Sequence, residues 1–127
     1  MIILLDTTIL IDLLRNRGSR RDLLAGLVEQ GHTLVTSAIN VAEVYAGMRA
    51  EEAADTNRLL RSIESYPITD GIARHAGTLK FASSQKGKTL PLLDMIVAAT
   101  ALAHGCSLMT DNRKDFPLLE LDFHPPS

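Results

Sequence analysis

The sequence has a single cysteine, no tryptophan and few aromatic residues, and each shortage excludes a class of protein or site. Cys106 alone cannot form an intramolecular disulfide, which fits a reducing compartment. One cysteine and four scattered histidines also provide no ligand set with the spacing of a zinc site. Aromatic residues make up 4% of the 127 residues, so a surface that stacks many bases is not expected.

Long apolar runs and an excess of one charge are missing as well. The opening apolar run is broken by Asp6 and Asp12 and lacks a preceding basic segment, and the run from Met95 to Ala103 is too short to cross a bilayer. The formal net charge is −2, so contact with a polyanion would need a local basic patch. We therefore expect a soluble, cytoplasmic protein that does not contact membranes.

Familiar catalytic motifs are also absent, because the sequence contains no G-x-S-x-G, no Walker A loop and no G-x-G-x-x-G. What is present is an alternation of short apolar strands and helices. Residues 2–5, 33–35, 66–68, 107–109 and 121–123 are expected to form strands. The alternation predicts one α/β domain over residues 1–127, with a mostly parallel sheet of four or five strands covered on both faces.

Acidic residues follow two of these strands. Asp6 ends the first strand, and Asp111 comes after the strand at 107–109 and Thr110. We expect these two strands to be neighbours near the middle of the sheet. Ligands of open α/β sheets bind at the carboxyl ends of the strands. The pattern therefore predicts that Asp6 and Asp111 lie at one functional edge.

Two further acids lie on helices. Glu43 belongs to a helix that Ser37 is expected to cap, and it shares one helix face with three apolar residues: Ile39, Ala42 and Ala46. A second apolar set would instead leave Glu43 in solvent: Val41, Val44 and Tyr45. Asp94 begins the most apolar helix of the chain, where an ordinary first-turn acid is also favoured by the helix dipole.

Taken together, these carboxylates point to a metal site. Carboxylates that converge repel one another and raise each other's pKa, and a bound Mg²⁺ or Mn²⁺ removes that cost. A metal held in this way can activate water and orient a phosphodiester, so that no covalent nucleophile is needed.

Four stretches of the chain also occur in a recognisable order. They are residues 5–11 around Asp6, residues 36–43 ending at Glu43, residues 93–101 containing Asp94, and residues 108–116 containing Asp111 and Asp115. Each stretch alone is a weak signal. Together they span nearly the whole chain and resemble the PIN domains, specifically the VapC-type toxins of bacterial toxin–antitoxin pairs.

The resemblance implies a three-layer α/β/α sandwich and a Mg²⁺-dependent endoribonuclease, with Mn²⁺ as the alternative ion. Its substrate would be RNA, often tRNA or rRNA. Asp6, Glu43 and Asp94 would be the core acids that hold the metal. The resemblance also implies a homodimer and a small VapB-like antitoxin, which often lays a helix into an apolar groove.

The fourth acid has two candidates. The family places it either directly after the strand threonine, here Asp111, or just before the phenylalanine, here Asp115. We prefer Asp111 because its position at a strand end mirrors that of Asp6. Thr8 occupies a place that often holds Ser or Asn near the water shell of the metal, and threonine keeps the hydroxyl.

Basic residues are expected to surround this acidic site. They fall at 15–21, 80–88 and 113–114, although the first group could also be a solvated turn. The predicted RNA contacts are four of these residues: Arg15, Arg17, Arg113 and Lys114. Three aromatic residues could stack on bases or belong to the core: Tyr45, Phe81 and Phe116.

Two other functions compete with the ribonuclease interpretation. An aspartate phosphatase of the haloacid dehalogenase type wants a second aspartate two residues after the nucleophile, and Thr8 stands at that position. A non-catalytic PIN-like module that only binds protein would not need to retain all of the acids. Both interpretations are therefore weaker than that of a metal-dependent endoribonuclease.

Overall fold

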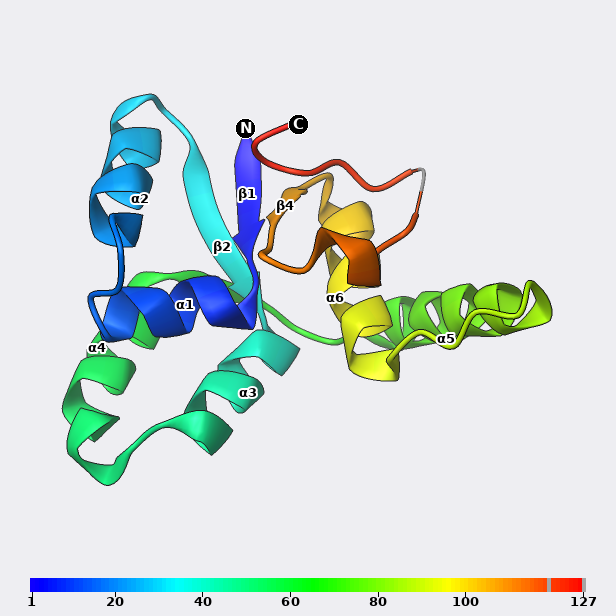
Figure 1. Cartoon of the computed structure of the whole chain (residues 1–127), viewed down its shortest axis with the longest axis horizontal. Helices are drawn as coiled ribbons and strands as arrows, with labels where there is room; N and C mark the ends of the chain where they lie inside the picture. The colour runs from blue at the N-terminus through cyan, green and yellow to red at the C-terminus, as the bar shows by residue number, and fades with distance from the viewer. Residues whose placement is uncertain (119, 127) are drawn as a thin grey trace.

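The protein, described here by a computed structural model over residues 1–118 and 120–126, is built on a parallel sheet of four strands (Figure 1). They are β1 (Ile2–Leu5), β2 (Thr33–Ser37), β3 (Glu64–Tyr66) and β4 (Ser107–Met109), in the spatial order β3-β2-β1-β4. The predicted pairing of β1 with β4 is confirmed, with Leu4 opposite Leu108. The strand expected at 121–123 is reduced to one bridge between Leu108 and Phe123.

Helices cover both faces of the sheet, as the α/β/α prediction requires. They are α1 (Thr7–Leu14), α2 (Arg20–Glu29), α3 (Ala38–Gly47), α4 (Ala53–Ser62), α5 (Asp70–Gln85) and α6 (Leu92–His104), with short 3₁₀ turns η1 (Ala50–Glu52) and η2 (Arg113–Asp115). The charged segment at 51–65, whose amphipathic pattern favours one helix, is divided among η1, α4 and the start of β3. In the part of the chain that the structure describes, no helix has the length and apolarity needed to cross a membrane.

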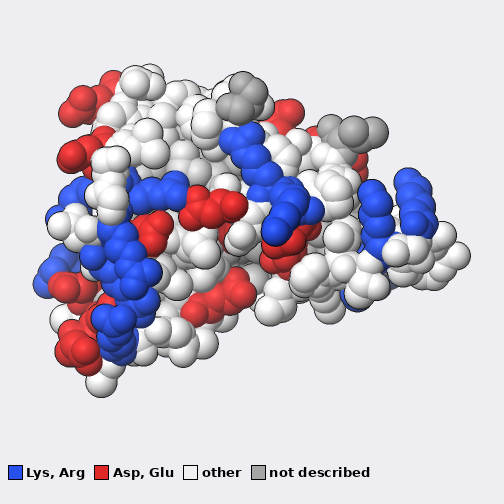
Figure 2. Space-filling view, in the orientation of Figure 1, with Lys and Arg blue, Asp and Glu red and all other residues white. Residues whose placement is uncertain are grey.

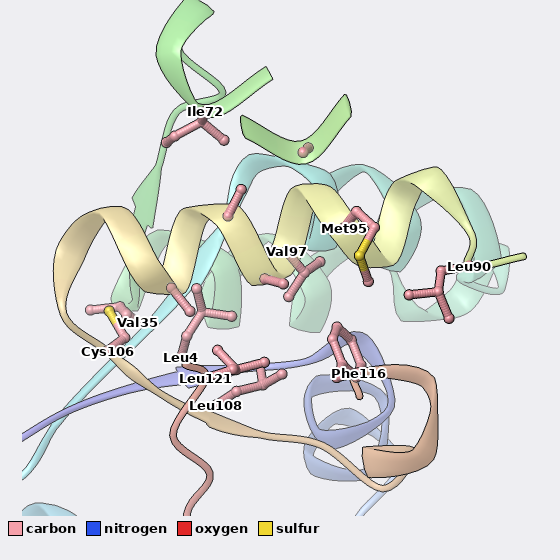
Figure 3. Close-up of a cluster of buried hydrophobic side chains, with 14 residues drawn as sticks. Leu4, Val35, Ile72, Leu90, Met95, Val97, Cys106, Leu108, Phe116 and Leu121 are labelled. Carbon is pink, nitrogen blue, oxygen red and sulfur yellow. The ribbon is translucent and has the colours of Figure 1, made fainter. Parts of the chain in front are cut away.

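The sheet has a hydrophobic core on each side. Ile3 and Leu5 of β1 belong to the core formed with α1, α2, α3 and α4, whereas Leu4 belongs to the core formed with α5 and α6. Figure 3 shows Leu4 and Leu108 below Val97 of α6 in this second core. Because all three β1 residues are fully buried, each contributes about 1.5–3 kcal/mol of hydrophobic stabilisation.

Local signals in the sequence begin the helices that carry the site. The carboxylate of Asp6 caps α1 by accepting the Thr7 N–H at 2.9 Å. The hydroxyl of Ser37 caps α3, as predicted, by accepting the Asn40 N–H. These caps fix the direction in which each helix leaves its strand, and they place the first turns of α1 and α3 at the carboxyl edge of the sheet.

The order of the strands creates a switch point in the middle of this edge. The chain passes from β1 to β2 to β3 in one direction, and then crosses to β4 on the other side of β1. The carboxyl ends of β1 and β4 therefore lie side by side where the direction of winding reverses. This is the place in an open α/β sheet where ligands bind.

Candidate active site

Asp6 is the buried centre of the switch point. Its side chain is 8% exposed, and each of its oxygens is hydrogen-bonded. Oδ1 accepts the Thr7 N–H and the side-chain amide of Asn40 at 3.0 Å, and Oδ2 accepts the Thr110 hydroxyl at 2.7 Å. A buried carboxylate is costly without such donors, so these bonds offset the cost of burying Asp6 and fix its orientation.

A chain of hydrogen bonds links Asp6 to Glu43. The amide of Asn40 also donates to the Thr7 hydroxyl at 3.0 Å, and that hydroxyl donates to Oε1 of Glu43 at 2.7 Å. Ser37 completes the chain by donating to the Asn40 side-chain oxygen. Glu43 is half-buried, so its exposure lies between the buried and the solvated alternatives that the sequence left open. The bond from Thr7 holds its carboxylate near the end of β1.

Asp94 lies near enough to Asp6 and Glu43 for their charges to act on it. It lies in the first turn of α6, is half-buried, and has a pKa raised from 3.8 to about 6. Burial is the largest cause, followed by the negative charges of Asp6, Asp115 and Glu43. The three predicted core acids therefore influence one another electrostatically, although they lie far apart in the sequence.

The donor chemistry of this site suits a hard divalent cation. Every candidate ligand is a carboxylate or hydroxyl oxygen, which is the preference of Mg²⁺ and Mn²⁺. Among the described residues, no three His, Cys, Asp or Glu side chains form a group tight enough to hold an ion by themselves. Mg²⁺ is commonly held by one or two carboxylates, with water and substrate phosphates filling the remaining positions, so the residues present fit such an ion.

Comparison with known proteins identifies the family. Residues 3–120 match the family described as PIN domain. The chain belongs to the PIN domain family. It is 34% identical to Ribonuclease VapC19 of Mycobacterium tuberculosis over 125 residues, which cover 97% of this chain and 98% of the relative.

Two solved structures support this assignment. A toxin–antitoxin complex from Klebsiella pneumoniae contains a chain with 30% identity, a TM-score of 0.77 and 92% coverage of each chain. VapBC2 from Rickettsia felis, bound to a promoter DNA fragment, has a TM-score of 0.84 at 24% identity, covering 95% of this chain and 96% of that one, which shows the same fold. The predicted resemblance to the VapC-type PIN domains and the predicted fold class are both confirmed.

The two candidates for the fourth acid have different surroundings in this PIN domain. Asp111 is exposed, and it pairs with Arg20, whose Nε also lies 3.4 Å from Asp12. Asp115, in η2, is half-buried and contributes to the raised pKa of Asp94. The geometry therefore favours Asp115 over Asp111, in contrast to the preference drawn from the sequence.

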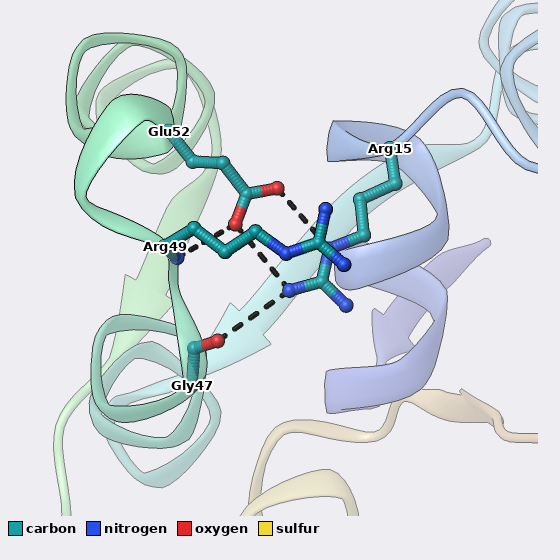
Figure 4. Close-up of polar contacts among 4 residues, drawn as sticks. All are labelled: Arg15, Gly47, Arg49 and Glu52. Atoms are coloured by element: carbon teal, nitrogen blue, oxygen red, sulfur yellow. Dashed lines mark hydrogen bonds and ion pairs between the residues drawn. The ribbon is translucent and has the colours of Figure 1, made fainter.

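Arg15 is engaged within the protein. Its guanidinium donates to both carboxylate oxygens of Glu52, at 3.1 and 3.3 Å, and to the Gly47 carbonyl at 3.5 Å (Figure 4). The side-chain bond from Arg15, followed by the backbone N–H of Arg49, lowers the pKa of Glu52 to about 2. These bonds tie the end of α1 to η1, so Arg15 serves the packing of helices more directly than contact with RNA.

The other predicted RNA contacts lie nearer the surface. Arg17 and Lys114 are exposed, whereas Arg113 is half-buried, contacts the Pro125 carbonyl and lies 5.1 Å from the ring centre of Phe123. Figure 2 shows acidic side chains near the middle of one face, with basic side chains on both sides of them. The basic rim expected around the acidic site stays a prediction.

Asn40 and Thr110 were missed as functional residues by sequence reasoning. Both are buried, and both hydrogen-bond to Asp6. Asn40 lies three residues before Glu43, on the same helix face, which is the signal that could have found it. The Thr8 hydroxyl is buried without a hydrogen-bond partner in the described part of the chain. Such an unpaired group is consistent with the predicted role beside bound water.

Proposed function

We propose that this PIN domain is the toxin of a VapBC-type toxin–antitoxin pair and a divalent-metal-dependent endoribonuclease. Its substrate would be tRNA or rRNA, and its ion Mg²⁺ or Mn²⁺. Support for RNA as the substrate comes from the 34% identity to a ribonuclease over nearly the whole chain. Among the alternatives, a haloacid dehalogenase-type phosphatase has no support in the family match.

The observation that carries the proposal is the hydrogen-bond chain that joins Asp6 to Glu43 through Asn40 and Thr7 at the switch point of the sheet. Asp94 lies near enough for the charges of Asp6, Asp115 and Glu43 to help raise its pKa. A protein does not gain stability by gathering several acids near one edge of its sheet, because carboxylates that lie close together repel one another. Such an arrangement is expected where a cation and a phosphate enter together.

The residues of the chain would have separate tasks. Asp6 and Asp94 would hold the ion, with Glu43 and Asp115 contacting it directly or through its water. When bound, the ion would supply an activated water and stabilise charge on the scissile phosphate. Asn40 and Thr110 would hold the Asp6 carboxylate in its orientation, since their side chains donate all of its observed hydrogen bonds except the one from the Thr7 backbone.

An antitoxin partner is supported by similarity to a chain from a toxin–antitoxin complex. A groove of about 670 Å³ runs between α1, α2 and α4 and has apolar and charged walls; it is lined by Leu13, Leu14, Arg21, Asp55, Arg58, Leu59 and Ser62. These residues suit an amphipathic helix of the antitoxin. A homodimer and a cytoplasmic location, where RNA and antitoxin would be met, complete the proposal.

RNA cleavage by the purified chain tests the proposed function. The wild-type protein should cleave tRNA or rRNA in Mg²⁺ and lose this activity in EDTA. Asp94→Asn and Asp6→Asn should each lower the cleavage rate by about 100-fold or more, because even residues that only support a metal ligand contribute about 10–100-fold. Asp22→Asn, which changes an exposed acid in the first turn of α2, is the matched control and should retain full activity.

The folding and the RNA cleavage of Asp94→Asn, compared with the wild type, distinguish a metal-dependent nuclease from the alternatives. Circular dichroism must show that Asp94→Asn is folded. If the folded variant still cleaves RNA in EDTA at the wild-type rate, the metal-dependent mechanism is wrong. If the wild-type protein binds an antitoxin but cleaves no RNA in either ion, the chain is a non-catalytic module.

A further inference from the structure

The segment after Asp70 differs in charge from the rest of the chain. Residues 71–93, which we call the basic arm, contain four cationic residues and no Asp or Glu, although the whole protein has a net charge of −2. The cationic residues are Arg74, which pairs with Asp70 at 2.6 Å just before the arm, and Lys80, Lys86 and Lys88. Helix α5 extends to the right in Figure 1, and Figure 2 shows basic side chains at that end of the molecule.

An aromatic side chain stands on the outward face of this arm. Ile72 and Ala76 of α5 are buried in the core, whereas Phe81 is 65% exposed. This contrasts with Phe116, which is 1% exposed, and it excludes the core as the place of Phe81, one of the two alternatives left open by the sequence. The neighbours of Phe81 on its face, Thr78 and Gln85, are exposed and uncharged.

The lysines beyond Phe81 are held in a fixed turn. Gly87 has φ +78°, and the Gly87 and Lys88 N–H groups bond to the Ser84 and Ser83 carbonyls, which closes the end of α5. Within residues 1–118 and 120–126, no acid forms an ion pair with Lys86 or Lys88. Favourable interaction with the helix dipole explains cations here, but it does not explain an exposed phenylalanine in the last turns of the same helix.

The basic arm leads directly to the active site. Lys80 Nζ donates to the Leu90 carbonyl at 2.6 Å, and the Leu90 side chain is buried, so the loop after Lys88 is anchored against α5 and the core. Helix α6 begins at Leu92, two residues before Asp94. A chain of nucleotides lying along the arm would therefore be led toward the catalytic acids.

We propose that the basic arm binds a single-stranded segment of the RNA substrate, with one base stacked on Phe81 and nearby phosphates contacted by Lys86 and Lys88. This inference rests on the proposed ribonuclease function. Stacking of bases on aromatic side chains, beside cations that track the backbone, is how proteins bind single strands with little sequence preference.

Binding of a labelled RNA oligonucleotide to the full chain tests the proposal. The Asp94→Asn background prevents cleavage, and fluorescence anisotropy measures the Kd. Phe81→Ala should weaken binding of a single strand by about fivefold or more, Phe81→Tyr should restore it, and binding of a duplex should change less. Because Phe81 is exposed, the thermal stability of both variants should stay close to that of the parent.

The salt dependence provides a second readout. The double variant Lys86→Gln/Lys88→Gln should reduce the slope of log K against log salt by about 1.4, since each phosphate contact on a single strand contributes about 0.7. The matched control is Arg49→Gln/Arg61→Gln, which removes the same charge from exposed positions just before η1 and on α4 and should leave the slope unchanged.

The outcomes distinguish failure of this inference from failure of the proposed function. If the wild-type chain cleaves RNA and the Phe81 and lysine variants bind RNA with unchanged affinity, the RNA-binding role of the basic arm is wrong and the proposed function stands. A change of oligomeric mass in Phe81→Ala with RNA affinity retained would assign the arm to a protein interface and also overturn that role. If the wild-type chain neither binds nor cleaves RNA, both proposals fail.

Discussion

Removal of the charge at Asp94 should stabilise the metal-free protein near neutral pH. The folded state raises the pKa of this carboxyl from 3.8 to about 6, so the folded chain binds the proton more tightly than the unfolded chain. Stability is therefore lost as the pH rises from 3.8 to about 6, and the loss is complete above that window. Asp94→Asn keeps the shape of the side chain and removes this loss.

The size of the effect follows from the shift. A rise in the pKa of Asp94 from 3.8 to about 6 corresponds to a free energy of about 3 kcal/mol when solvent screening is left out. Asp94 is only half-buried, so solvent screening reduces the value, and we expect a gain of about 1 kcal/mol at pH 7.5. For a domain of this size, that gain corresponds to a rise in Tm of roughly 3–5 °C.

Urea denaturation in EDTA at several pH values measures this difference. The stability advantage of Asp94→Asn over the wild type should be about 1 kcal/mol at pH 7.5 and should shrink toward zero near pH 4. Millimolar Mg²⁺ should reverse the order at pH 7.5, because a ligand that binds only the folded state stabilises it. An Asp94→Asn protein that is less stable than the wild type at pH 7.5 in EDTA would refute the electrostatic reasoning.

Three shorter predictions follow from other contacts. Asn40→Ala removes a fully buried amide that bonds to a carboxylate, so it should lower stability by about 2–4 kcal/mol, and an unchanged Tm would contradict this. Asp115→Asn should reduce RNA cleavage at least about tenfold and Asp111→Asn less than about threefold, and the reverse order would restore Asp111 as the fourth acid. Cys106 is buried, with a pKa raised to about 11, so thiol reagents at pH 8 should label it only after unfolding; rapid labelling of the folded chain would argue against that burial.

Much of the fold could be predicted because its signals are local. The apolar run before Asp6 and the cap at Ser37 each fixed an element, and parallel pairing then brought the strand ends to one edge. What local signals do not specify is how far an element continues. The charged segment near residues 51–65 therefore reads as one helix, although Glu64–Tyr66 pairs with β2 as a strand.

The site was less predictable in its details than in its location. Asp6 and Asp94 could be located because strand ends and helix starts are visible in the sequence, whereas the choice of Glu43 came from the resemblance to the PIN domains. The choice between Asp111 and Asp115 depends on a tertiary contact, since Arg20 comes from a distant helix to pair with Asp111. The same holds for Arg15, whose partner Glu52 lies 37 residues away.

Titration of the wild-type chain and Asp94→Asn with Mn²⁺, followed by calorimetry, tests most directly whether the acids at the switch point form one cation site. We predict saturable binding at millimolar or lower concentrations for the wild type, with affinity at least about tenfold weaker in the variant. Equal Mn²⁺ affinity in the two proteins, or no binding to the wild type at millimolar concentration, would contradict the account.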